Sequence, residues 1–362
     1  MRYHACATGG RSTAARISAA AVAGLALISA TAAFGQTLTE GPLSPGAVVS
    51  DGTFGTSAWT LPGNATASDN SYTVSAPGGL PTQYLKATNF GFNIPAPAQI
   101  FGIEVAVERR STANLVTDER ARIVKGGVIG AAERALPGVW PTVDTTVTYG
   151  TPSDLWGETW TPADINAAGF GFALSVDDGV DAAAVDHVTI TVTYSLCASS
   201  PAAGCRTSLK SILVVKDNAN NAKDKLVWKW VKGASTTQAE FGDPDNGTAN
   251  MALCLYENGA LTSETLVAPG AGWTTISTKG WKFLDKTGAQ DGIQKIILKG
   301  STNNKAKALV KGKGINLPDT APPPFTLPVT VQLVNSESGI CWEGVFASAT
   351  KNVGGSFKAK DQ

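Results

Sequence analysis

Residues 187–194, with the sequence HVTITVTY, alternate strictly between polar and apolar side chains. Successive side chains of a β-strand point to opposite faces of a sheet, so this alternation predicts a strand with one buried and one solvent-facing side. The Val and Ile side chains and the terminal Tyr belong to the buried side, whereas His187 and the three threonines belong to the exposed side.

The same two-residue period recurs through the first half of the chain. It marks candidate strands over residues 90–94, 101–108, 121–124, 145–149 and 170–176. Gly- and Pro-containing turns separate these runs, and one short helix is expected to start at Thr161, with Pro162 at its first position and Asp164 as capping partner. Many short strands with one buried face predict an all-β fold. Residues 37–196 are therefore expected to form a β-sandwich, of jelly-roll type.

The pattern of residues 206–362 also indicates β-structure and predicts a second β-sandwich-like domain. The candidate strands are 209–216, 226–231, 251–256, 293–298, 308–310, 329–334 and 344–347. The stretch 317–328 holds five prolines, which lack amide donors, so it is expected to be a loop or an edge. Lys305/Lys307 and Lys311/Lys313 alternate along one run and are interpreted as the guard of an exposed edge strand.

The small residues and Pro of 197–205 cannot build a core, so this segment is interpreted as a linker between two domains. The charge changes at the same place. Residues 37–196 carry 7 Lys+Arg against 16 Asp+Glu, a net charge of −9, whereas residues 205–362 carry 19 against 13, a net charge of +6. Such asymmetry bears on association and solubility. It would let the two domains attract one another or let the second sit against an anionic surface; a solvated Lys-rich surface is the alternative.

Residues 1–35 have the three parts of a secretory signal peptide. A basic segment without acidic residues is followed by an apolar run over residues 17–28 and then by small residues near position 32. The apolar run is shorter than the roughly 20 residues that span a bilayer, and no other stretch is apolar enough to do so. We expect an exported protein, extracellular, periplasmic or at the cell surface, without a membrane span.

Four cysteines remain after the signal peptide, namely Cys197, Cys205, Cys254 and Cys341. An even number in an oxidising compartment predicts two disulfides, with three pairings open. Cys197–Cys205, closing a small loop in the linker, together with Cys254–Cys341 is the favoured pairing. A zinc site is the alternative, but no CxxC motif with an accompanying histidine supports it.

Short motifs in both halves resemble known groups of proteins. Residues 85–95 (LKATNFGFNIP), 100–105 (IFGIEV), 154–157 (DLWG) and 185–190 (VDHVTI) resemble a β-rich domain of uncharacterised exported bacterial and phage-associated proteins. Residues 228–230 (WKW), 241–244 (FGDP), 291–293 (DGI) and 331–333 (VQL) resemble Lys-rich C-terminal modules of uncharacterised secreted bacterial proteins. These resemblances imply two β-rich exported domains and imply no activity or catalytic residue.

Residue types argue against several classes of enzyme. The mature chain has one histidine, His187, on the polar side of its strand, and no GxSxG motif surrounds a serine. The remaining catalytic mechanism is one that uses a pair of carboxylates, as in glycosidases. The candidate pairs are Glu104 with Glu108, and Asp154 with Glu158 beside two tryptophans, with structural roles as the alternative. We expect no catalytic residue.

The acidic loop containing Asp177, Asp178 and Asp181 is a candidate site for structural calcium, because hard cations take several oxygen ligands from flexible loops. Its spacing does not match a helix-flanked calcium loop. Residues 217–224 form a second, weaker candidate. No other cofactor is expected, since phosphate-binding loops and dinucleotide fingerprints are missing from the sequence.

Nine tryptophans suggest stacking on sugar rings. The candidate platforms are Trp156, Trp160, Trp228 and Trp230, with a core position as the alternative for most tryptophans. The sequence thus favours an exported, non-catalytic protein of binding, adhesion or cell-surface structural type, whose candidate partner is a glycan or another cell-surface component. No motif in the sequence predicts nucleic-acid binding. The alternatives are a carbohydrate-active enzyme with paired carboxylates and a self-assembling surface subunit.

Overall fold

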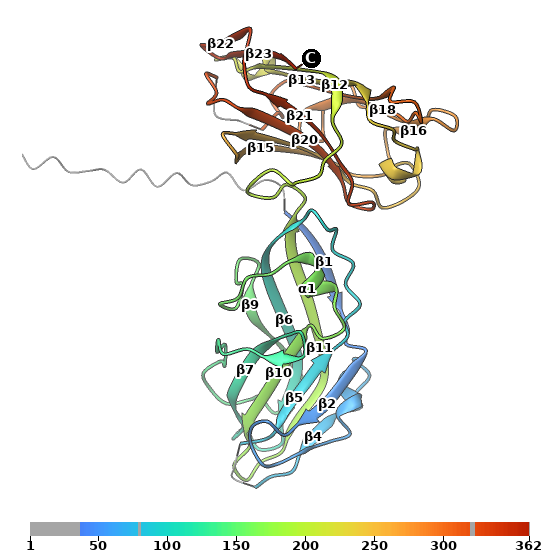
Figure 1. Cartoon of the computed structure of the whole chain (residues 1–362). Helices are drawn as coiled ribbons and strands as arrows, with labels where there is room; N and C mark the ends of the chain where they lie inside the picture. The colour runs from blue at the N-terminus through green and yellow to red at the C-terminus, as the bar shows by residue number, and fades with distance from the viewer. Residues whose placement is uncertain (1–36, 79–80, 319–322, 362) are drawn as a thin grey trace, which may run out of the picture. The chain divides into compact units, whose positions relative to one another are not determined.

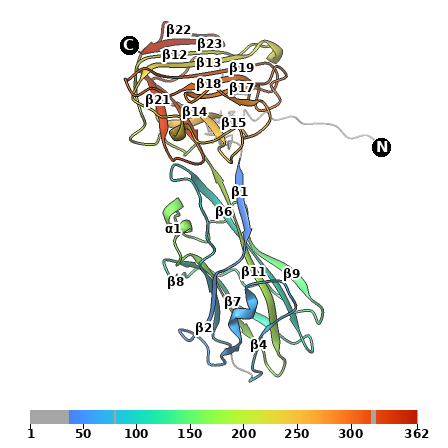
Figure 2. The same cartoon turned by 90° about the vertical axis from the view of Figure 1, so that its right-hand side faces the viewer.

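The chain folds into antiparallel β-sheets connected by turns (Figures 1 and 2). The computed structural model describes residues 37–78, 81–318 and 323–361. The predicted signal peptide, residues 1–35, lies outside these ranges. The described part of the chain contains no helix with the length and apolar character that a membrane crossing requires.

Eleven strands between residues 38 and 195 form two sheets, with strand orders β3-β4-β11-β6-β9, where β1 also pairs with β11, and β2-β5-β10-β7-β8. The strands are β1 (Leu38–Leu43), β2 (Ala47–Asp51), β3 (Trp59–Thr60), β4 (Thr73–Ser75), β5 (Tyr84–Thr88), β6 (Gln99–Ser111), β7 (Thr117–Lys125), β8 (Val128–Ile129), β9 (Thr145–Thr151), β10 (Gly171–Asp177) and β11 (Ala183–Ser195).

The connectivity of these sheets is that of a jelly roll, as expected. Strand β4 pairs with β11, β5 with β10, β6 with β9, and β7 with β8. These four nested antiparallel pairs form one long ribbon, and successive pairs fall alternately in the two sheets. Rolling such a ribbon up gives two packed sheets with Greek-key connections, which is the jelly-roll arrangement.

Strand β11 shows why the alternating sequence folds in this way. Val188, Ile190 and Val192 are buried in the core between the sheets, whereas Thr189 and Thr191 lie on the outer side. The predicted helix is present as α1 (Pro162–Asn166), where Thr161 and Asp164 form a capping box. Three short 3₁₀ segments complete the helical part, η1 (Pro62–Ala65), η2 (Asn221–Lys223) and η3 (Ala239–Phe241).

Twelve strands between residues 208 and 361 form an eight-stranded sheet, β16-β17-β18-β19-β13-β12-β23-β22, and a four-stranded sheet, β15-β14-β20-β21. Tryptophans and aliphatic side chains of both sheets share one core, which makes this half a second sandwich. The strands are β12 (Ser208–Lys216), β13 (Lys225–Gly233), β14 (Met251–Glu257), β15 (Ala260–Val267), β16 (Trp273–Thr275), β17 (Gly280–Leu284), β18 (Ile293–Lys299), β19 (Ala306–Lys313), β20 (Val329–Asn335), β21 (Cys341–Phe346), β22 (Lys351–Val353) and β23 (Ser356–Asp361).

The four cysteines form two disulfides, but the favoured pairing is wrong. The bonds are Cys197–Cys254 and Cys205–Cys341. Cys254 lies on β14 and Cys341 begins β21, and β20 lies between these strands. Two strand spacings amount to about 10 Å, which is more than a disulfide can bridge. Residues 197–205 instead lie against this four-stranded sheet, where the Gln332 side chain exchanges two hydrogen bonds with the backbone of Ala202.

The strands of the two sheet pairs thus come from residues 38–195 and 208–361, on either side of the predicted linker. The division of the chain into two independent domains stays a prediction.

The prediction that the alternating lysines guard an edge strand is wrong for strand β19. It carries Lys307, Lys311 and Lys313, but it pairs with β13 and β18 and is therefore an interior strand rather than an edge.

Candidate binding face

Three of the four tryptophans predicted as sugar platforms are fully buried. Trp156 packs edge-on against Phe172 and donates its ring N–H to the Ile103 carbonyl, 2.9 Å away. Trp228 and Trp230 point inward from β13, into the core of the second sandwich. A buried ring cannot stack on a glycan, so the structure contradicts the platform prediction for these three. The core alternative is the correct one.

The fourth tryptophan, Trp160, is half-buried. Its ring packs edge-on against Phe170 at a centroid distance of 5.3 Å, and its N–H donates to the Leu155 carbonyl. The ammonium group of Lys125 lies 5.1 Å from the ring centroid. These contacts cover the end of the first core, and one isolated partly exposed ring gives no strip of platforms for a sugar chain.

The carboxylate of Asp154, one of the candidates proposed for an enzyme, forms an ion pair with Arg134. Asp154 accepts two hydrogen bonds from the Arg134 guanidinium, at 2.6 and 2.9 Å, and a third from the Trp156 amide. Pairing with Arg134 holds the pKa of Asp154 below its usual value, which suits a structural ion pair rather than a proton donor. No contact between Asp154 and Glu158 is recorded among the described residues. Glu104 and Glu108 lie on the outer side of β6, where Glu108 is opposite His187.

The calcium prediction fails at Asp181. This carboxylate is 2% exposed and accepts hydrogen bonds from the backbone N–H groups of Thr112, Ala113 and Leu115 and from the Thr112 hydroxyl. These donors overcome burial and lower the pKa of Asp181 to about 2. A cation would meet N–H hydrogens in place of free oxygen lone pairs. Within residues 37–78, 81–318 and 323–361, no group of three or more His, Cys, Asp or Glu side chains could hold a metal ion.

The other two members of the acidic loop have separate environments. Asp177 accepts the Gly179 amide, as turn aspartates commonly do. Asp178 is buried, and that burial raises its pKa. His187 is half-buried on the outer face of β11, with its Nε2 2.9 Å from the Ser44 hydroxyl.

The first sandwich also contains a buried ion pair between Arg109 and Asp118. Asp118 accepts further hydrogen bonds from the Tyr149 hydroxyl at 3.0 Å and the Trp140 ring N–H at 2.7 Å. The Arg109 guanidinium lies 4.4 Å from the centroid of the Trp140 ring. The charges are thus neutralised and bonded inside the core, which is the pattern of a structural pair.

The largest concentration of one residue type lies on the eight-stranded sheet of the second sandwich. In β13 the inward Trp228 and Trp230 alternate with the outward Lys225 and Lys229. Neighbouring strands continue the pattern, because directly paired residues share a face. Figure 2 shows β22, β23, β12, β13, β19, β18 and β17 side by side. We call their outward side the lysine face, and its lysines are Lys210, Lys216, Lys225, Lys229, Lys282, Lys295, Lys299, Lys307, Lys311, Lys313, Lys351, Lys358 and Lys360.

Many of these lysines are direct cross-strand neighbours. Lys225 is opposite both Lys216 and Lys313, and the pairs Lys295–Lys311, Lys299–Lys307 and Lys351–Lys358 repeat the arrangement. Like charges directly opposite each other destabilise a sheet. The outward positions of these seven strands hold no acidic residue, and no ion pair is recorded for their lysines in the described part of the chain. The positive charge of the lysine face is therefore not balanced by acidic residues on the same face.

Aliphatic side chains lie between the lysines. Ile212, Val214 and Val227 line a shallow hollow in the middle of the face, together with six lysines: Lys225, Lys229, Lys311, Lys313, Lys358 and Lys360. The face can thus offer apolar contact at its centre and cationic groups around it. The sequence signal was present in the alternating Lys residues of single strands, but only the strand order shows that they form one surface.

No protein-family model matches the chain, and no curated protein matches it either. A crystal structure of Bacteroides uniformis beta-glucuronidase is similar, with 10% sequence identity, 86% of this chain and 32% of that chain covered, and a TM-score of 0.16. This chain spans about a third of that structure. At this TM-score the likeness carries no argument, and the two resemblances noted in the sequence stay predictions.

Proposed function

We propose that the protein is an exported, non-catalytic binding protein, and that its lysine face holds an acidic polysaccharide at a cell surface. The observation that carries the proposal is the array of lysines on seven adjacent strands, with like charges placed opposite one another. A sheet gains no stability from this arrangement, but a polyanion lying across it would neutralise many charges at once. The two disulfides agree with an oxidising compartment.

The type of cation supports a polymer rather than a small anion. Lysine is a flexible point charge, whereas arginine offers a planar fork that fixes one carboxylate or phosphate. The lysine face carries no arginine. Six strand spacings extend it over about 30 Å, which suits a long ligand. The net charge of −9 on residues 37–196 would direct an anionic polymer toward the second half of the chain.

The test compares binding of the purified mature protein to soluble polygalacturonate and to neutral dextran, by titration calorimetry at several salt concentrations. Polygalacturonate is expected to bind with an affinity that falls steeply with salt, and dextran is expected not to bind. At about 1 kcal/mol per lysine near an anionic surface, the triple variant K225Q/K229Q/K311Q should bind about 100-fold more weakly.

The matched control is K223Q/K279Q/K286Q, which removes the same charge from residues outside the lysine face. An equal loss in this control would show that net charge alone is responsible and would overturn the assignment of the face. Tighter binding to a single-stranded oligonucleotide of equal charge would overturn the polysaccharide as ligand.

The opposite charges of the two halves favour a second candidate, in which the lysine face of one molecule contacts the acidic half of another. This candidate expects association at low salt that depends on protein concentration, measured by sedimentation velocity. A monomer at all concentrations in low salt excludes it.

A further inference from the structure

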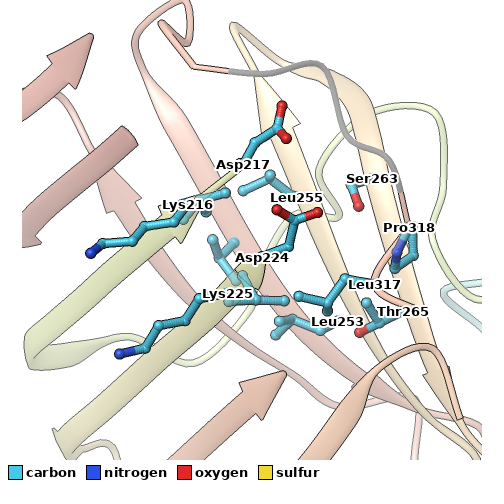
Figure 3. Close-up of a pocket in the computed structure, with 13 residues that line it drawn as sticks. Lys216, Asp217, Asp224, Lys225, Leu253, Leu255, Ser263, Thr265, Leu317 and Pro318 are labelled. Atoms are coloured by element: carbon cyan, nitrogen blue, oxygen red, sulfur yellow. The ribbon is translucent and has the colours of Figure 1, made fainter. Parts of the chain in front are cut away.

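A small cavity opens between the two sheets of the second sandwich, away from the middle of the lysine face (Figure 3). Its volume is about 40 Å³, and its apolar wall comes from the ends of β12 and β13, from the middle of β14, from β20 and from the segment after β19. This is room for three or four water-sized groups. The apolar lining residues are Val215, Leu226, Leu253, Leu255, Leu317 and Val331.

Asp224 brings a charge into this apolar cavity. The residue is 6% exposed, and Figure 3 shows its carboxylate directed toward the cavity. Oδ1 accepts the Asn218 amide at 2.7 Å, and no donor to Oδ2 is recorded among the described residues. The backbone holds the residue in place, because its N–H donates to Asn221 and its carbonyl accepts from Gly314. The second carboxylate oxygen is therefore open to solvent or to a cation that enters the cavity.

Two hydroxyls lie on the opposite wall. Ser263 and Thr265 occupy inward positions of the edge strand β15, where an apolar side chain would otherwise complete the core. Figure 3 places them across the cavity from Asp224, while the ammonium groups of Lys216 and Lys225 point away from it. Among the described residues, the carboxylate and both hydroxyls can therefore accept hydrogen bonds inside the cavity, and the ammonium groups of the two lysines do not reach it.

We propose that this cavity binds a small primary ammonium ion with an aliphatic tail. The three N–H donors of the ammonium group match the carboxylate of Asp224 and the hydroxyls of Ser263 and Thr265, and the tail contacts Leu253 and Leu255. An anion would be repelled by Asp224, and a neutral alcohol would leave its charge uncompensated. A few convergent polar groups in an apolar cavity are the usual composition of a small-molecule site. The proposal does not rest on the lysine face.

The experiment titrates the intact mature protein, in phosphate buffer free of amines, with ethylammonium, ethanol and acetate, whose size matches the small volume of the cavity. Binding is followed through the ¹³C-methyl resonances of Leu253 and Leu255. Saturable shifts are expected with ethylammonium, at least tenfold weaker binding with ethanol, and none with acetate. Equal affinity for ethanol, or no saturable shift with ethylammonium, would overturn the proposal without the use of any variant.

The variant D224N tests the carboxylate itself. Its amide oxygen can still accept the Asn218 N–H, so the backbone contact is kept while the charge is removed. We expect it to bind ethylammonium at least tenfold more weakly than the wild type. D361N removes the same charge from β23, outside the cavity lining, and should bind as the wild type does. Unchanged binding in D224N, or an equal loss in D361N, would show that Asp224 is not the recognition group.

Discussion

Glu264 should make the stability of the second sandwich fall as pH rises. The residue lies on β15, is 4% exposed, and accepts one hydrogen bond from the Ser195 hydroxyl at 2.9 Å. Burial raises the pKa of this carboxyl from 4.5 to about 7, against the opposing effect of the Ser195 hydrogen bond and with a smaller contribution from the charge of Asp291. The folded protein therefore holds this proton more tightly than the unfolded chain does.

The sign and size of the effect follow from that difference. The contribution to stability is complete below pH 4.5, where both states are protonated, and it is lost as the pH rises to about 7. At 1.36 kcal/mol per pKa unit, the loss amounts to about 3 kcal/mol. The substitution E264Q keeps a neutral side chain of similar shape at every pH, so the variant should not show this loss.

Urea unfolding at pH 5 and pH 8, without reductant, measures the effect. The free energy of unfolding of E264Q relative to the wild type should rise by about 2.5 kcal/mol between these two pH values, because part of the loss has already occurred at pH 5. E104Q, which removes a partly exposed carboxylate from the outer side of β6, serves as the matched control. If wild type and E264Q have the same pH dependence, Glu264 is not a buried acid with a raised pKa, and the reasoning fails.

Three further predictions concern the first sandwich and the disulfides. D118N breaks the buried ion pair and should lower the free energy of unfolding by about 3–5 kcal/mol, whereas D144N, at a more exposed pair, should cost less than about 1 kcal/mol; urea unfolding of both variants checks this. A non-reducing digest should give a peptide linked through Cys197 and Cys254, and the double Ser variant should lose up to about 4 kcal/mol in a urea melt, given the separation of 57 residues. Because the folded protein lowers the pKa of Asp181 to about 2, the ionised carboxylate contributes about 2 kcal/mol to the free energy of unfolding. This contribution is present above pH 4 and is lost as the pH falls through 2. In an acid-unfolding experiment, the stability of D181N should therefore depend less on pH in this range than that of the wild type.

Alternation along the sequence predicted the first sandwich because its strands have one buried side. Over 187–194 every apolar residue enters the core, and over 101–108 Ile103, Val105 and Val107 do so, because the sequence period of two is the physical period of a strand. The strands of the second sandwich were predicted less completely. Strands β15 and β17 were not predicted, because their sequences ALTSETLV and GWKFL mix polar and apolar residues without regular alternation. Thr265 faces the cavity from the same side of β15 as the core residue Val267.

The disulfide pairing and the tryptophan positions could not be read from the sequence for a different reason. Both depend on which strands are neighbours, and a local pattern does not contain that information. Cys254 and Cys341 look free to pair until β20 is placed between their strands. Trp228 and Trp230 share one side of β13 in either reading, but only packing against the four-stranded sheet makes that side the core.

The lysine face also depends on which strands are neighbours, and its unbalanced charge favours binding of an anionic ligand. Residues 225 and 313 are far apart in the sequence, and each alone is an ordinary exposed lysine. Register places them opposite one another, and Lys216 is opposite Lys225 on the other side. Charge on a sheet surface is easily balanced by placing Glu opposite Lys, which would stabilise the pairs instead of opposing them. Throughout the described outward positions of these seven strands the balancing carboxylates are missing, so the strands themselves do not compensate the charge. Solvent counterions can supply the compensation at a cost in stability; a polyanion would supply it and release those ions, which is the physical basis for assigning this face to binding.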